Sequence, residues 1–301
     1  MTRTAVSTTQ FRQDALNQGF TKTADVAWGG TATSSLDVYK PSATAGTLRP
    51  VVAVLHGSWC PSVTWRSYGP LVGLSQTLAD NGFVAVLPDF LQVPSCSGST
   101  SAIYRQGMIS DTLALVTWLR GNMGAYGGDT SKIALLGESA GAQLAIMAGI
   151  QGVSGGSRPD AVIAWSPPGK LYSTAYASDG AHSAVKQYID NYLGSTAATT
   201  QQLYSPYDQM TSNMCPMRIA GGSSESDLGI PQQEFDDLTS AALARGVDVD
   251  ERVFTNSLHA DLRGLDTDAS MAWLRAKLQW AAQTSRAAAG TRAAAGTRAA
   301  A

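Results

Sequence analysis

The chain has 301 residues, a hydrophobic fraction of 44% and a formal net charge of −2. This length and composition allow one substantial core. A near-neutral charge without a basic cluster argues against nucleic acid as a partner, and no apolar stretch reaches the roughly 18 residues that span a bilayer. Residues 1–20 carry no secretory signal pattern, so we expect a cytoplasmic protein or the mature form of a secreted one.

Apolar runs and segments with helical spacing alternate after a polar leader. The expected strands are 36–39, 51–55, 83–87, 133–136, 161–165, 217–220 and 247–254. The expected helices surround 71–78, 109–119, 235–242 and 271–278, with another directly after residue 139. Runs without polar alternation suit strands buried on both faces, so the pattern predicts an α/β fold with a mostly parallel sheet covered by helices.

The domain organisation follows from composition. Residues 1–285 are expected to form one domain, in which the insertion 166–214 is too long for a plain connection and is expected to form a small cap. Residues 286–301 repeat Ala, Gly, Thr and Arg with too little apolar bulk for a core, and we exclude them as a low-complexity tail.

The motif G-x-S-x-G follows the predicted strand 133–136, with Ser139 at its centre. A strand, a tight turn and a helix in this order present the serine hydroxyl above a parallel sheet, as an acyl-transfer nucleophile requires. A second match around Ser154 has no strand before it and glycines after it, so we interpret that match as a loop.

Such a nucleophile needs a base, and the chain has three histidines. His56 ends a predicted strand and His182 lies in the insertion, whereas His259 lies between the last strand and the last helix. A base downstream of both the nucleophile and the acid is typical of this arrangement, so we predict His259.

The acid that orients the base is expected in the loop after strand 217–220. Asp227 and Glu225 both lie there, and either is chemically suitable. We prefer Asp227 and keep Glu225 as the alternative.

Donors for the oxyanion are expected from the backbone N–H groups of Ser58, after strand 51–55, and Ala140, after the nucleophile. Four aromatic residues follow strands that end at the same edge of the sheet and are candidates for an acyl or aryl pocket. They are Trp59, Trp65, Tyr68 and Trp165. Core packing is the alternative for each of them.

Several segments together resemble the α/β-hydrolase esterases, close to the carboxylesterase, hormone-sensitive-lipase-like and kynurenine-formamidase-like groups. The segments are LDVYKPS at 36–42, HGSW at 56–59, YGGDTSKIALLGESAGAQLA at 126–145, YLGS at 192–195, SP at 205–206 and DLGIP at 227–231. The resemblance implies catalysis without a metal or organic cofactor, and it supports Asp227, four residues before Pro231. In this fold Cys60 and Cys96 follow neighbouring strands, and a disulfide between them is a hypothesis that this placement allows.

We therefore expect a serine hydrolase that cleaves small acyl or aryl esters through an acyl-enzyme intermediate. The resemblance leaves two alternatives: an arylformamidase-type amidase and a non-catalytic ligand-binding α/β-hydrolase. The expected partner is a small-molecule ester, and the oligomeric state is not predicted.

Overall fold

The structure is a computed structural model and describes residues 19–29, 34–42, 46–61, 64–95, 102–177, 180–223 and 229–280. The predicted tail 286–301 lies outside these residues. Among the helices that are described, none is long and apolar enough to cross a membrane.

Eight strands of the described chain form one sheet in the order β1-β2-β4-β3-β5-β6-β7-β8. Their bounds are β1 Phe20–Ala27, β2 Ser35–Pro41, β3 Arg49–Leu55, β4 Val84–Pro88, β5 Gly128–Glu138, β6 Ala161–Trp165, β7 Met217–Gly222 and β8 Val249–Phe254. Strands β1 and β2 pair antiparallel, as do β2 and β4, and all later pairs are parallel. The mostly parallel sheet predicted from the sequence is confirmed.

Strand β1 lies in the segment that the sequence analysis treated as a polar leader. Six of its eight residues are exposed, and it occupies the edge of the sheet. An edge strand needs little apolar surface, because hydrogen bonds to one neighbour and charged side chains suffice to hold it. Its polar sequence therefore gave no strand signal.

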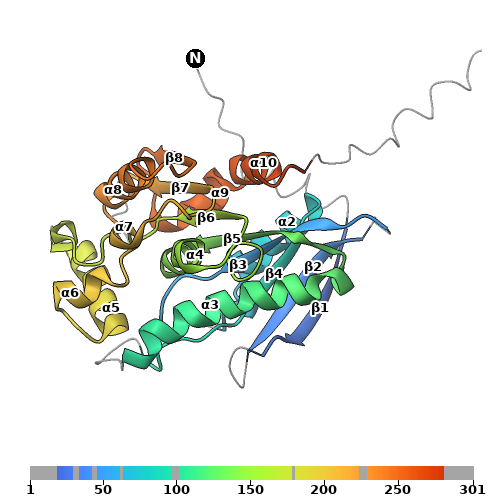
Figure 1. Ribbon diagram of the computed structural model, residues 1–301, viewed down its shortest axis with the longest axis horizontal. Coiled ribbons are helices and arrows are strands. Elements are labelled where there is room, and N and C mark those ends of the chain that lie inside the picture. Colours follow the sequence, from blue (N-terminus) through green and yellow to red (C-terminus); the bar gives the residue numbers. More distant parts are fainter. Residues whose placement is uncertain are drawn as a thin grey trace, which may run out of the picture.

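Helices cover both faces of the sheet, as Figure 1 shows. The longer helices are α2 Gly69–Asp80, α3 Ala102–Asn122, α4 Ala140–Gln151, α5 Gly180–Leu193, α8 Gln232–Leu243 and α10 Thr267–Lys277. Along β3, Val51 and Ala53 pack into the core that includes α3 and α4, whereas Val52 and Val54 pack into the core on the α2 and α10 side. A strand buried on both faces has no polar positions, which explains the unbroken apolar run.

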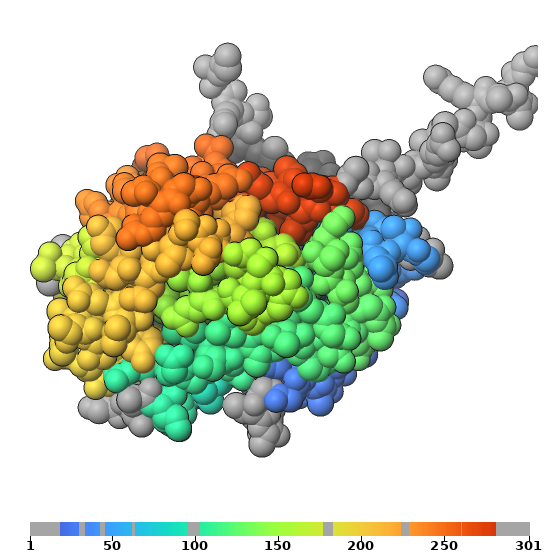
Figure 2. All heavy atoms as spheres, viewed as in Figure 1, coloured from blue at the N-terminus to red at the C-terminus, as the bar shows by residue number. Residues whose placement is uncertain are grey.

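Residues 166–214, expected to be a cap, carry several helices between β6 and β7. These are the 3-10 helix η3 Thr174–Ala177, then α5, α6 Ala198–Gln202 and α7 Pro206–Gln209. The amide of Gln143 on α4 donates to the carbonyl oxygen of Tyr204 at 2.9 Å, and the hydroxyl of Tyr192 donates to the carbonyl oxygen of Arg105 on α3. In Figure 2 this part of the chain, in yellow, borders the green surface of α3 and α4.

Candidate active site

Ser139 occupies the junction between β5 and α4 with a backbone conformation of φ 55° and ψ −118°. Left-handed angles are strained for a residue with a side chain, and such strain concentrates at functional sites. The Ser139 amide is held by the carbonyl oxygen of Trp165 on β6 at 2.8 Å. The sharp turn expected at this motif is therefore present, fixed against the neighbouring strand.

The two glycines of the motif are sterically required. A Cβ on Gly137 would collide with the carbonyl oxygen of Gly141, and a Cβ on Gly141 would collide with the carbonyl oxygens of Leu55 and His56. Because these atoms belong to the backbone, they cannot move aside as a side chain does. The glycines let α4 pass close against the end of β3 and bring the turn beside residues 56–58.

The predicted oxyanion donors, Ser58 and Ala140, belong to the loop after β3 and to the start of α4. A Cβ placed on Gly57 would be 3.4 Å from the Cβ of Ser139, so the loop after β3 lies directly against it. Ser58 has φ 68°, another strained non-glycine residue. Ala140 is the first residue of α4, where backbone N–H groups lack intrahelical partners and the helix dipole favours negative charge.

His56 fixes the peptide group that carries the first of these donors. Its ring is stacked between Trp65 and Phe90, with centroid distances of 4.5 and 4.1 Å. Nδ1 lies 2.8 Å from the carbonyl oxygen of Gly57. Burial lowers the pKa of His56 to about 3, so the neutral ring carries the proton on Nδ1 and donates it to that carbonyl. The carbonyl of Gly57 and the N–H of Ser58 belong to one planar peptide and point in opposite directions.

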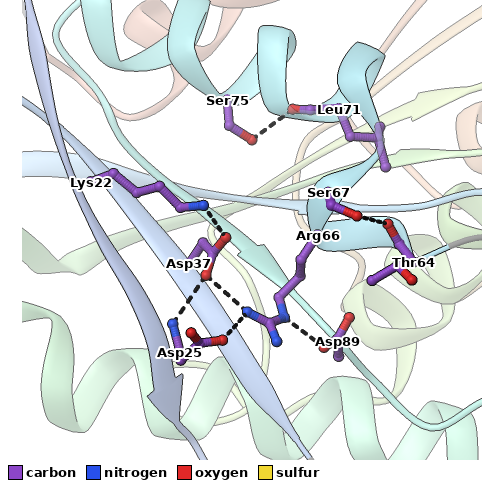
Figure 3. A network of polar contacts seen from close by, with 9 residues as sticks. All are labelled: Lys22, Asp25, Asp37, Thr64, Arg66, Ser67, Leu71, Ser75 and Asp89. Carbon is purple, nitrogen blue, oxygen red and sulfur yellow. Dashed lines mark hydrogen bonds and ion pairs between the residues drawn. The ribbon is translucent and has the colours of Figure 1, made fainter.

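An ion-pair cluster holds the aromatic stack in place. Arg66, next to Trp65 in the 3-10 helix η1 Trp65–Ser67, contacts Asp25 at 2.7 Å, Asp37 at 2.9 Å and Asp89 at 2.6 Å. Figure 3 shows Arg66 reaching from η1 towards these aspartates. Burial alone would raise the pKa of Asp37, but bonds from Lys22, the Asp25 amide and Arg66 outweigh it and lower that pKa. The cluster therefore joins η1 to the edge strand β1 and its neighbour β2.

His259 begins the 3-10 helix η4 His259–Asp261 and is 7% exposed. The turn before it is closed by the carboxylate of Asp261, which accepts from the Leu258 amide at 2.8 Å. The short helix α9 Leu262–Leu265 follows directly. The predicted base is therefore a buried residue on a short turn after β8, in which Leu258 and Asp261 are exposed.

Two ion pairs tie α9 to the sheet. At its start, Arg263 forms a two-point contact with Glu138, with Nε to Oε2 at 2.8 Å and Nη2 to Oε1 at 2.5 Å. At its end, Asp266 accepts from Arg218 Nε at 3.0 Å and Trp165 Nε1 at 3.0 Å. Glu138 is the residue before Ser139, so the first pair connects the turn at Ser139 with the segment 259–265 that carries His259.

A model of the BD-FAE family matches residues 36–241, which is more than half of the chain. The chain belongs to the BD-FAE family. It is an α/β-hydrolase of the esterase kind, as the sequence resemblance implied.

Curated relatives match a shorter part of this BD-FAE chain. A probable isoprenylcysteine α-carbonyl methylesterase of Arabidopsis thaliana is 30% identical over 141 residues, which are 47% of this chain and 31% of that protein. A probable enzyme of the same description from Oryza sativa subsp. japonica is 32% identical over 121 residues, covering 40% of this chain and 26% of that protein. The matched region thus spans about a third or less of these relatives.

Solved structures share the fold. A truncated carbohydrate esterase from gut microbiota superposes with a TM-score of 0.68 at 17% identity, over 87% of this chain and 98% of that one. Esterase B from Lactobacillus rhamnosis gives a TM-score of 0.67 at 17% identity, over 90% and 92%. At these identities the likeness establishes the α/β-hydrolase fold.

The predicted acids of this BD-FAE chain, Asp227 and Glu225, lie outside the described residues, so the choice between them stays a prediction. Ser223, the last described residue before them, is bonded to the end of β8 and the turn that follows it. Ser223 donates its amide to the carbonyl oxygen of Phe254, and the Asn256 amide donates to the Ser223 hydroxyl at 3.2 Å.

The four predicted pocket aromatics separate into different environments. Trp59 is 5% exposed, stacks on Tyr192 of α5 at 4.8 Å and lies 3.3 Å from the Gln143 side chain through its Nε1. Trp65 and Tyr68 are half-buried and meet edge-to-face at 5.6 Å. Trp165 is fully buried and hydrogen-bonded to Asp266, so it corresponds to the core-packing alternative and lines no open pocket.

The remaining predictions concern the cysteines, the second motif match and His182. Cys60 is disulfide-bonded and Cys215 is a free buried thiol. Cys96, the expected partner of Cys60, lies outside the described residues. The second motif match around Ser154 lies in a turn after α4, as interpreted from the sequence, and the side chain of His182 in α5 is outside the described part.

Sequence reasoning missed Glu138 and Arg263, which are 125 positions apart. A charged residue inside the nucleophile motif was the one available signal, because a carboxylate at a buried turn needs a partner. Nothing in the sequence identified that partner.

Proposed function

We propose that this chain hydrolyses carboxylic esters of small acyl or aryl groups through an acyl-enzyme intermediate on Ser139. The observation that carries the proposal is the strained turn at Ser139, set between the N-terminus of α4 and the peptide of Gly57 and Ser58. A serine in this position meets the substrate carbonyl where backbone N–H groups converge.

In the proposed mechanism, His259 accepts the hydroxyl proton while Ser139 Oγ attacks the ester carbonyl. The N–H groups of Ser58 and Ala140 stabilise the oxyanion. The imidazolium then gives its proton to the departing alcohol oxygen as the C–O bond breaks. Water attacks the acyl-enzyme by the same route and releases the acid. Asp227 orients the imidazole, with Glu225 as the alternative.

The preference for small acyl groups is supported by Trp59. Its ring follows the oxyanion donor Ser58 and is enclosed between the start of α4 and the Tyr192 ring of α5. A large buried ring beside the oxyanion donor leaves little room for a long chain, and we propose residues 166–214 as the cap that keeps it there. One structural neighbour, an esterase of Thermogutta terrifontis, is described with propionate bound, which is a small acyl group.

The proposal is tested with p-nitrophenyl esters of graded acyl length, using native protein and Ser139→Ala. We expect the highest kcat/KM for the shortest acyl groups and a loss of at least about a thousandfold in the variant. N-formylkynurenine is assayed in parallel. Hydrolysis of the formamide without hydrolysis of any ester would contradict the proposal, as would equal turnover by native protein and the variant.

A further inference from the structure

Arg263 and Glu138 join the two segments that must meet for catalysis. Glu138 ends β5 and is bonded through its peptide to Ser139, while Arg263 lies four residues after His259. Glu138 is 6% exposed, and the Arg263 side chain is 19% exposed. Both nitrogen-to-oxygen contacts are of hydrogen-bond length, at 2.8 and 2.5 Å.

We infer that the Arg263–Glu138 ion pair positions His259 relative to Ser139, so that both are positioning residues for proton transfer to the leaving group. This inference rests on the proposed function. The guanidinium fork binds both carboxylate oxygens at once and therefore fixes direction as well as distance.

The segment that carries His259 cannot fix its own position. Helix α9 has four residues, too few for a helix that is stable alone. Its far end is anchored by Asp266, which is fully buried and bonded to Arg218, Trp165 and Ser270. Its near end, next to η4, is anchored by Arg263. Arg263 thus joins the start of α9, directly after η4, to the end of β5.

The pair also balances charge beside the reacting atoms. A carboxylate next to Ser139 would oppose the negative charge that develops on the substrate oxygen, and Arg263 offsets it. The guanidinium is itself held over the Tyr68 ring at 5.8 Å. A lysine at this position would retain the positive charge but could not bind both carboxylate oxygens with two N–H groups in a fixed plane.

A comparable ion pair provides the control. Arg120 donates to both carboxylate oxygens of Asp160 at 3.0 Å, and its side chain is 12% exposed. Asp160 precedes β6, so this pair lies at the opposite end of the parallel strands from Ser139. Its loss should lower stability without changing the geometry of proton transfer.

The test compares two acetyl esters that differ in their need for an acid. p-Nitrophenolate leaves without protonation, whereas ethoxide needs the proton of the His259 imidazolium. We expect Arg263→Ala to reduce kcat/KM about tenfold for p-nitrophenyl acetate and about 100-fold for ethyl acetate, as a displaced catalytic group does. The kcat/KM values of Arg263→Lys should lie between those of Arg263→Ala and the native protein. The double variant Glu138→Gln with Arg263→Ala should have kcat/KM values no lower than those of Arg263→Ala.

Arg120→Ala should lower the midpoint of thermal unfolding and leave the ratio of the two kcat/KM values unchanged. The positioning role would be overturned if Arg263→Ala lowered kcat/KM equally for both esters, or if the loss of kcat/KM in the double variant were the sum of separate losses from the two substitutions. A native protein that hydrolyses neither ester would overturn the proposed function, and this inference with it.

Discussion

Replacing His56 tests how the oxyanion donor is held. His56→Phe keeps an aromatic ring between Trp65 and Phe90 but removes the donor to the Gly57 carbonyl. His56→Asn is the matched control, because its side-chain amide places a donor near the position of Nδ1. Neither replacement titrates.

The lowered pKa of His56 sets how strongly the free energy of unfolding depends on pH. The unfolded chain binds a proton near the ordinary histidine pKa of 6.5, whereas the folded chain does so only near pH 3. The contribution of the neutral His56 to the free energy of unfolding is therefore fully present above pH 6.5 and is lost as the pH falls towards 3. Between pH 8 and pH 5, His56 should remove about 2 kcal/mol from the free energy of unfolding, and neither variant should show this contribution.

The assay is urea unfolding of native protein, His56→Phe and His56→Asn at both pH values, with kcat measured at pH 8. We expect the stability difference between native and either variant to change by about 2 kcal/mol between the two pH values. We expect kcat to fall about 10- to 100-fold in His56→Phe, less than for complete loss of an oxyanion donor, and to change little in His56→Asn. A stability difference that is the same at both pH values would refute the buried neutral imidazole, and unchanged kcat in His56→Phe would refute its effect on Ser58.

Three further predictions concern the acid, the acyl site and the motif. Asp227→Asn should reduce kcat by roughly 10³- to 10⁴-fold while Glu225→Gln changes it little, and the reverse result in steady-state assays would assign the acid to Glu225. Trp59→Leu should raise kcat/KM for hexanoyl relative to acetyl esters by about tenfold, and an unchanged ratio across the p-nitrophenyl series would remove Trp59 from the acyl site. Gly141→Ala should give little folded protein by near-ultraviolet circular dichroism, because its Cβ would meet the Leu55 and His56 carbonyls, and a native-like spectrum would contradict that clash.

The sheet was predictable wherever burial alone decides the residue type. Strands such as β3 and β5 are enclosed by helices on both faces, so their apolar runs were visible without any partner being known. The edge strand β1 was not predictable in this way, because it is held by hydrogen bonds to β2 and by the ion pair of Lys22 with Asp37 at 2.7 Å. Those interactions depend on a neighbour in space rather than on a local pattern.

The candidate site shows the same division. The turn at Ser139 was predictable because it imposes glycines on both sides within five residues. Trp165 shows the limit of strand-end reasoning, since a residue at the end of a strand can point into the core as readily as into a pocket. The pairing of Glu138 with Arg263 spans 125 positions and depends on where the fold places α9 relative to the end of β5.

The most direct test of the account is the rate and site of reaction with a fluorophosphonate. The account predicts one adduct per chain, located by mass spectrometry on the peptide that contains Ser139, and labelling at least about a thousandfold slower in His259→Ala. An adduct on another residue, or equal labelling rates in native protein and His259→Ala, would contradict it.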